Sequence, residues 1–165
     1  MLDTMTRYLT GFSEVKHRIA LRFIAEPIVD RFSSQPLNTA GLAITGGGGT
    51  AAKIGASDFY AVANGILVKI AASTTLPALV GTITAASFNV FCFFVDSAAV
   101  ATVAMGTEGT TLAKVKFPTF PKNKTLVGFL IVTYASTFTG GTTALDTATT
   151  VYVNGAGPFD PSVLI

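Results

Sequence analysis

The sequence predicts an all-β protein: an antiparallel β-sandwich or jelly-roll-like barrel of about seven or eight short strands, preceded by a partly helical N-terminal arm. Three observations predict it. Short runs rich in β-branched and aromatic residues recur along the chain. Gly, Pro, Asn and Asp separate these runs, as is typical of turns. Nine of the twenty formal charges fall in residues 1–36, which sets that segment apart from the rest.

The predicted strands begin with a hairpin in "DFYAVANGILVKIAA" (58–72), whose Asn64-Gly65 step is a strong two-residue turn signal. Several later runs are continuously apolar, whereas a half-exposed strand would alternate. We expect such strands to be covered on both faces, by a second sheet and then by a neighbouring copy. The remaining predicted strands are 79–85, 88–95, 98–105, 110–120, 125–135 and 147–155, of which 98–105 alone also fits a helix.

The chain divides into a charged N-terminal arm (1–36), a glycine-rich connector (37–57) and a β-sandwich domain (58–165). Apolar residues in the arm recur at spacings of three and four, which places them on one face of a helix. Pro27 interrupts this pattern. The arm either extends from the domain or folds back onto it, and the pattern leaves both open. The residues on the helical face are Phe12, Val15, Ile19 and Phe23.

The connector contains "TGGGGTAAKIGAS" (45–57), in which four glycines precede a lysine. A phosphate-binding loop requires Gly-x-x-x-x-Gly-Lys-Ser/Thr, but Lys53 is followed by Ile54 and Gly55. The spacing therefore does not fit nucleotide binding. Because glycine reaches every allowed backbone region, we interpret the stretch as a flexible joint or a tight crossover.

Residue types for catalysis or metal binding are scarce. His17 is the only histidine and Cys92 the only cysteine, so neither a histidine-activated nucleophile nor a zinc ligand set is indicated. The acids of the β region are isolated at turn-like positions: Asp58, Asp96, Glu108, Asp146 and Asp160. We predict that the protein is not an enzyme and has no catalytic, metal or cofactor site.

Membrane and nucleic-acid partners are also not indicated. The longest clean apolar run, 126–135, is about half the roughly 20 residues that a membrane-spanning helix needs. The formal net charge is only +2. Four lysines gather around two Phe-Pro steps in 114–124, without the arginines or aromatic ladder of a base-stacking surface. We interpret this stretch as a charged loop that keeps a strand edge soluble.

The segment "KTLVGFLIVTYASTFTGGTTALDTATTVYVNGAGPF" (124–159) resembles the end of head decoration, or cement, proteins of tailed bacteriophages. The shared pattern is an apolar strand, an aromatic-x-Gly-Gly-Thr-Thr-Ala-Leu-Asp loop from Phe138 to Asp146, and a strand ending in Tyr-Val-Asn at Asn154. The glycine-rich loop and apolar strands upstream fit the same pattern, so that the resemblance covers about two thirds of the chain. The N-terminal arm matches least.

The resemblance implies a non-enzymatic virion protein that binds the outer surface of a phage head, clamps adjoining shell subunits and forms a homotrimer. Its partners are then the major capsid protein and copies of itself, and its location is the capsid surface. The arm concentrates the arginine and aromatic residues that are enriched in interface hot spots. The contact hypothesis therefore names Phe12, Arg18, Arg22, Phe23 and Arg31.

Two other readings remain open on the sequence. The chain could be another virion subunit, of a shell or a tail tube, although main shell proteins are usually longer. It could instead be a receptor-binding fibre or tip module with a sugar site. Such sites usually use Trp or Tyr platforms, and this chain has no Trp and four Tyr.

Overall fold

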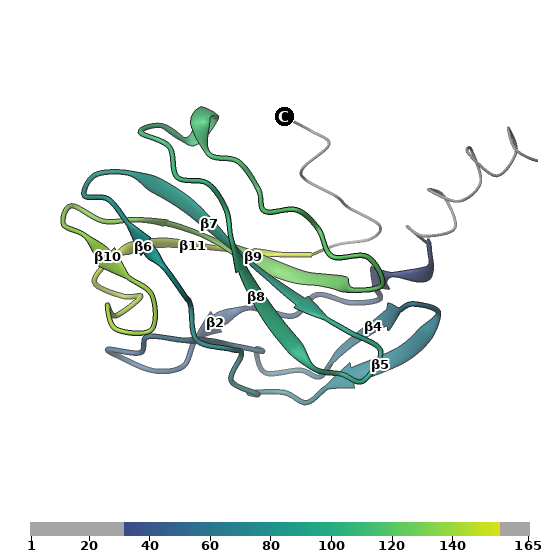
Figure 1. The fold of residues 1–165 in the computed structure, drawn as a ribbon. Helices are drawn as coiled ribbons and strands as arrows, with labels where there is room; N and C mark the ends of the chain where they lie inside the picture. The colour runs from purple at the N-terminus through teal and green to yellow at the C-terminus, as the bar shows by residue number, and fades with distance from the viewer. Residues whose placement is uncertain (1–31, 156–165) are drawn as a thin grey trace, which may run out of the picture.

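The computed structural model describes residues 32–155, which form eleven strands in four antiparallel sheets (Figure 1). The largest sheet has four strands in the order β11-β9-β7-β8. Its two central strands are also the two longest, with eight and nine residues. The bounds of this sheet are β7 (Phe88–Val95), β8 (Ala101–Met105), β9 (Thr125–Thr133) and β11 (Thr149–Asn154).

Three smaller sheets complete the fold. The first has the order β1-β4-β5, with β1 (Gln35–Pro36), β4 (Phe59–Ala63) and β5 (Ile66–Ile70). The second pairs β2 (Ala43–Ile44) with β3 (Ala52–Lys53). The third pairs β6 (Thr82–Ile83) with β10 (Phe138–Thr139).

The antiparallel, mostly-β architecture predicted from the sequence is confirmed, but a closed barrel is wrong. The sheets remain separate, because β8 and β11 have no partner beyond the four-stranded sheet among the described residues. The count of seven or eight strands was too low. Five of the eleven strands are two-residue pairings, which are too short to show a period in the sequence.

The two central strands of the four-stranded sheet, β7 and β9, are buried on both faces, because side chains of alternate residues enter two different cores. Phe91, Phe93 and Val95 belong to the larger core, whereas Cys92 and Phe94 belong to the smaller one. A bulge in the pairing of β7 with β9 lies between Phe93 and Phe94. This arrangement explains why both strands read as continuous apolar runs.

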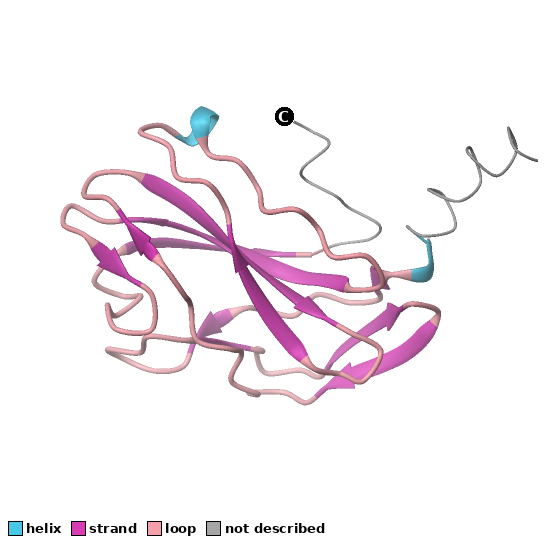
Figure 2. Cartoon of the chain, in the orientation of Figure 1, coloured by secondary structure: helices cyan, strands magenta, loops and turns pink. Residues whose placement is uncertain are grey.

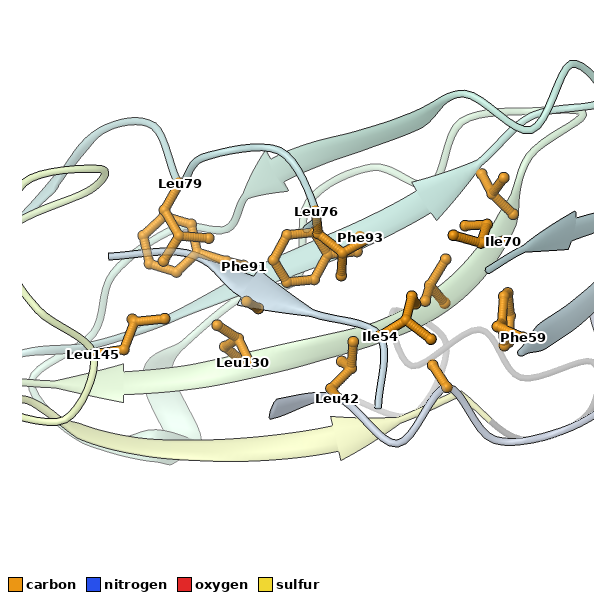
Figure 3. Close-up of a cluster of buried hydrophobic side chains, with 14 of the residues drawn as sticks. Leu42, Ile54, Phe59, Ile70, Leu76, Leu79, Phe91, Phe93, Leu130 and Leu145 are labelled. Carbon is orange, nitrogen blue, oxygen red and sulfur yellow. The ribbon is translucent and has the colours of Figure 1, made fainter. Parts of the chain in front are cut away.

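The larger core lies between the four-stranded sheet and the three small sheets. Figure 3 shows its side chains converging from β4, β5, β7, β9 and the loops between the small sheets. Phe59, Ile54 and Leu79 are completely or almost completely buried although they come from different small elements. The small sheets therefore act together as the cover of this face.

The smaller core is covered by the chain's own segment between β8 and β9, drawn in Figure 2 as a long loop with one short helix. Phe120 packs edge-on against Phe94, with ring centroids 5.0 Å apart, and Phe117 against Phe129 at 5.1 Å. The chain therefore supplies a cover of its own for this second face. The expectation that a neighbouring copy also covers it stays a prediction.

The predicted strand 110–120 is wrong. Its residues form a 3₁₀ helix, η1 (Leu112–Lys114), and then a loop whose only pairing is a bridge between Lys116 and Thr107. Pro118 and Pro121 supply no backbone N–H for a ladder, so the two phenylalanines beside them pack inward from irregular backbone.

The β4–β5 hairpin follows its prediction closely. Asn64 has φ 52° and Gly65 has φ 75°, as a two-residue turn with two left-handed positions requires. Phe59 pairs with Ile70 and Ala63 with Ile66 across the ladder. The run 98–105, which also fitted a helix, is a strand from residue 101 onward.

The structure places part of the predicted connector in the fold. Its four-glycine stretch forms the turn between β2 and β3, and Leu42 and Ile54 on either side are buried in the larger core. The division of the chain at residues 36 and 57 stays a prediction. The predicted helical arm lies, apart from its last five residues, outside the described residues.

A glycine in the middle of β9 gives a test of this packing. In Gly128→Ala, the new Cβ would lie 2.5 Å from the Val153 carbonyl oxygen and 2.6 Å from Leu42 Cδ1. We expect unfolding free energy to fall by about 1–3 kcal/mol, as for other overpacked sites. Urea unfolding of the variant and of the unmodified chain measures this change in free energy.

The matched control is Gly47→Ala, where an added Cβ meets nothing within 4 Å. Its unfolding free energy should stay within about 1 kcal/mol of that of the unmodified chain. Equal urea midpoints for the two variants would contradict the close approach of β11 and Leu42 to β9.

Candidate interaction surface

The carboxylates of the described residues serve the backbone rather than a common site. Asp146 accepts a hydrogen bond from the Gly48 N–H at 2.7 Å, and Glu108 accepts from both the N–H and the hydroxyl of Thr84. Asp96 accepts from two N–H groups of its own turn. Within residues 32–155, no three His, Cys, Asp or Glu side chains gather as a metal site would require.

The Glu108 interaction also shows in its ionisation. The hydrogen bond from the Thr84 N–H, followed by that from its hydroxyl, lowers the pKa of the Glu108 carboxyl below its ordinary value. A carboxylate held charged in this way is a poor general acid. Its role is to fix the loop after β6.

Cys92 is buried in the smaller core between β8 and β9. Burial in apolar surroundings raises the pKa of its thiol from 9.0 to about 12. Since the thiolate is the nucleophile, this cysteine is inert at neutral pH. Cys92 thus acts as a small buried hydrophobic residue. His17 lies outside the described residues.

The glycine-rich turn and the Gly-Gly-Thr-Thr-Ala-Leu-Asp loop, far apart in sequence, are joined in space. In addition to the Asp146 contact, the Leu145 N–H donates to the Gly49 carbonyl at 2.8 Å. Leu145 itself is buried in the larger core. The loop is closed on itself by Thr143, whose hydroxyl accepts from the Thr139 N–H. Both segments therefore have a structural role, since their polar groups bond to one another within the fold.

An open depression of about 380 Å³ lies beside this loop and is lined by Ala86, Thr133, Tyr134, Ala135, Thr147 and Thr149. It contains no carboxylate, amine or imidazole. Every buried side-chain polar atom in the described part of the chain has a hydrogen-bond partner. The depression therefore presents no unpaired buried group to a ligand.

Some of the exposed apolar residues, in contrast, lie together on one sheet. Leu37, Tyr60 and Leu67 lie on or beside the outward side of β1-β4-β5 with the half-buried Val62, and we call this surface the outer apolar face. Leu67 is 65% exposed and Tyr60 38%. Cross-strand pairing places Leu67 beside Val62 and Lys69 beside Tyr60. The outer apolar face consists of Leu37, Tyr60, Val62 and Leu67.

An ion pair borders this face. Lys69 Nζ lies 2.6 Å from Asp58 Oδ2 and 5.9 Å from the centre of the Tyr60 ring. The Lys69 hydrogen bond, followed by that from the Ala72 N–H, lowers the pKa of Asp58, and Asp58 raises the pKa of Lys69. The outward side of an antiparallel sheet is ordinarily polar. Here its charge is confined to this one border.

The hypothesised contact residues Phe12, Arg18, Arg22, Phe23 and Arg31 all lie outside the described residues. The structure therefore brings none of them together, and the hypothesis stays a prediction. Sequence reasoning did not single out the outer apolar face. The available signal was that Tyr60, Val62 and Leu67 are apolar at the positions of the hairpin where alternation calls for polar residues.

The buried thiol predicts a pH dependence. The unfolded chain ionises Cys92 near its ordinary pKa, whereas the folded chain does so only near pH 12. Its neutral form thus favours folding up to about pH 9, and this advantage is lost as the pH rises further. Relative to Cys92→Ala, the unmodified protein should lose about 1.4 kcal/mol of unfolding free energy between pH 7 and pH 10.

Urea unfolding of both proteins at each pH measures this difference. The Lys and Tyr residues titrate in both proteins, so their contribution cancels when the two unfolding free energies are subtracted. Alkylation of Cys92 by iodoacetamide should be slow in the native protein and fast in urea. A difference in unfolding free energy that stays constant to pH 10 would refute the burial of the thiol.

Comparison with known proteins adds no relative. No protein-family model matches the chain, and no curated protein and no solved structure matches it significantly. Among residues 32–155 no helix has the length and apolar character of a membrane span.

Proposed function

We propose that this chain is a capsid decoration protein, a non-enzymatic virion component that binds the outer surface of a phage head and stabilises adjoining shell subunits. The proposal rests on the resemblance of residues 124–159 to cement proteins of tailed bacteriophages. The observation that carries it is the structural role of the described part of that segment, residues 124–155. The polar groups of its loop form hydrogen bonds within the fold and so stabilise its shape, as a scaffold for contacts requires.

On this proposal the fold is a β-sandwich. The four-stranded sheet is one layer, and the three small sheets facing it across the larger core make the other, broken layer. The β9 and β11 strands stand at the two ends of the resembling loop and pair along six residues, from Thr149 with Thr133 to Asn154 with Gly128. That pairing supports reading the segment as one structural unit.

The proposed assembly is a homotrimer seated on the major capsid protein. A stable protein interface buries about 1,200–2,000 Å² in total. The outer apolar face gives each copy one surface suited to partial burial, and the arm gives a second through Phe12, Arg18, Arg22, Phe23 and Arg31. Contacts of this size act together when many copies occupy a closed shell, because each one holds its neighbours in place.

The number of copies per particle tests the proposal. In purified particles from the source, quantitative mass spectrometry should find this chain at a ratio to the main shell protein that approaches parity. A mild wash should remove it and leave the heads intact.

Other outcomes select the other functions. Heads that break when the chain is removed would make it a shell subunit, and recovery with tails would make it a tail-tube subunit. A handful of copies together with glycan binding would indicate a receptor-binding tip. Absence from the particle would refute the decoration function and these three other virion functions alike.

The arm gives a second test. The double variant Arg18→Ala, Arg22→Ala should bind washed heads at least about tenfold more weakly, since two hot-spot arginines of about 1 kcal/mol or more each are removed. Co-sedimentation with heads measures binding. The control Lys122→Ala removes an exposed positive charge from the β8–β9 loop and should bind as the unmodified chain does. Equal binding by all three proteins would exclude the arm as the contact.

A further inference from the structure

The outer apolar face has no cover among the described residues. Leu67 and Leu37 are each more than half exposed, while the residues on the opposite side of β4 and β5 are buried. Elsewhere in the described chain the large exposed apolar residues are separate positions: Val80 and Val100 on loops, Leu112 in η1 and Val151 on β11. Isolated exposed residues are ordinary, but a contiguous apolar patch marks a contact surface.

The chain enters the described structure at the edge of this face. The Ser33 carbonyl accepts a hydrogen bond from the Gly65 N–H at 2.7 Å, and the Ser34 hydroxyl accepts from the Asn64 N–H at 3.0 Å. These contacts hold the start of the described chain against the turn of the β4–β5 hairpin. Thirty-one residues precede Phe32. The described chain therefore begins at the hairpin end of the outer apolar face.

The preceding segment has an apolar pattern of comparable length. Phe12 and Phe23 end a helically spaced stripe, and eleven steps of 1.5 Å along a helix span about 17 Å. The four steps between the ends of β4 or β5 span about 14 Å. The eight residues 24–31 reach at most about 27 Å, enough for the stripe to turn back over the sheet.

We propose that residues 12–23 pack through Phe12, Val15, Ile19 and Phe23 on the outer apolar face of their own chain. An apolar stripe and an apolar sheet surface of comparable length can bury each other, which is the ordinary way a helix covers a sheet. The short link makes the effective concentration of the segment at this face about millimolar, above that of a second copy in dilute solution. The occupant is thus the chain's own segment.

This arrangement concerns the unattached protein, and it does not depend on the proposed function. Where both hold, Phe12 and Phe23 are covered before attachment and must leave the sheet to grip a shell subunit. Attachment would then exchange one apolar contact for another.

Hydrogen exchange followed by mass spectrometry of the full chain tests the docking. Amides of residues 12–23 should exchange at least about tenfold more slowly than in an unstructured peptide of the same sequence. Leu67→Glu should abolish this protection, because it places a charge on the face directly beside Val62. Val80→Glu is the matched control, since Val80 is 71% exposed and lies on the loop leading to β6, away from the β4–β5 hairpin (Figure 1). It should leave the protection unchanged.

A cross-link between native lysines identifies the occupant. Isotope-labelled and unlabelled chains are unfolded, mixed, refolded together and treated with an amine-reactive cross-linker. Docking within one chain predicts Lys16–Lys69 cross-links only between segments of the same label. Cross-links that join the two labels would overturn the proposal in favour of a second copy. Unprotected amides in residues 12–23, or protection that survives Leu67→Glu, would overturn the docking itself.

Discussion

The pairing of β7 with β9 is the constraint on which the rest of the structure depends. These strands are the longest in the described chain, and their apolar side chains leave both faces of the sheet in need of cover. The small sheets pack against one face, and the Phe117 and Phe120 loop packs against the other. Apart from the β4–β5 hairpin, each of these elements has few backbone hydrogen bonds of its own. Their conformation is therefore fixed mainly by packing on the apolar surface that they cover, and less by local propensity.

Sequence patterns predicted the strong elements and missed those that depend on context. The 88–95 run coincides with β7, and the Asn64-Gly65 turn was identified because its left-handed geometry restricts the residue types. The 110–120 run has apolar residues but forms no strand, since prolines interrupt it and its phenylalanines serve the smaller core. Whether separate sheets close into a barrel is set by long-range packing, which no local period encodes.

The candidate surface was predictable only in part. The arm was distinguished by its charge and by its helical spacing, both of which are local properties. The exposure of Tyr60 and Leu67 was hidden, because an apolar residue on a strand reads as buried until the neighbouring sheets are known. The contact between Gly49 and Leu145 could not be predicted either. The two residues are almost a hundred positions apart in the chain, so no local pattern indicates that they meet.

The contacts between the two ends of the described chain have a consequence for how the protein is made. The Leu42 N–H donates to the Asn154 side chain, and Gly48 depends on Asp146, over separations of 112 and 98 residues. Folds dominated by such non-local pairings form slowly, because a long loop must close before any contact rewards it. The early segments cannot reach their final positions until the last strand has been translated. During synthesis the apolar strands β7 and β9 must therefore wait without their full cover, and aggregation competes with folding at that stage.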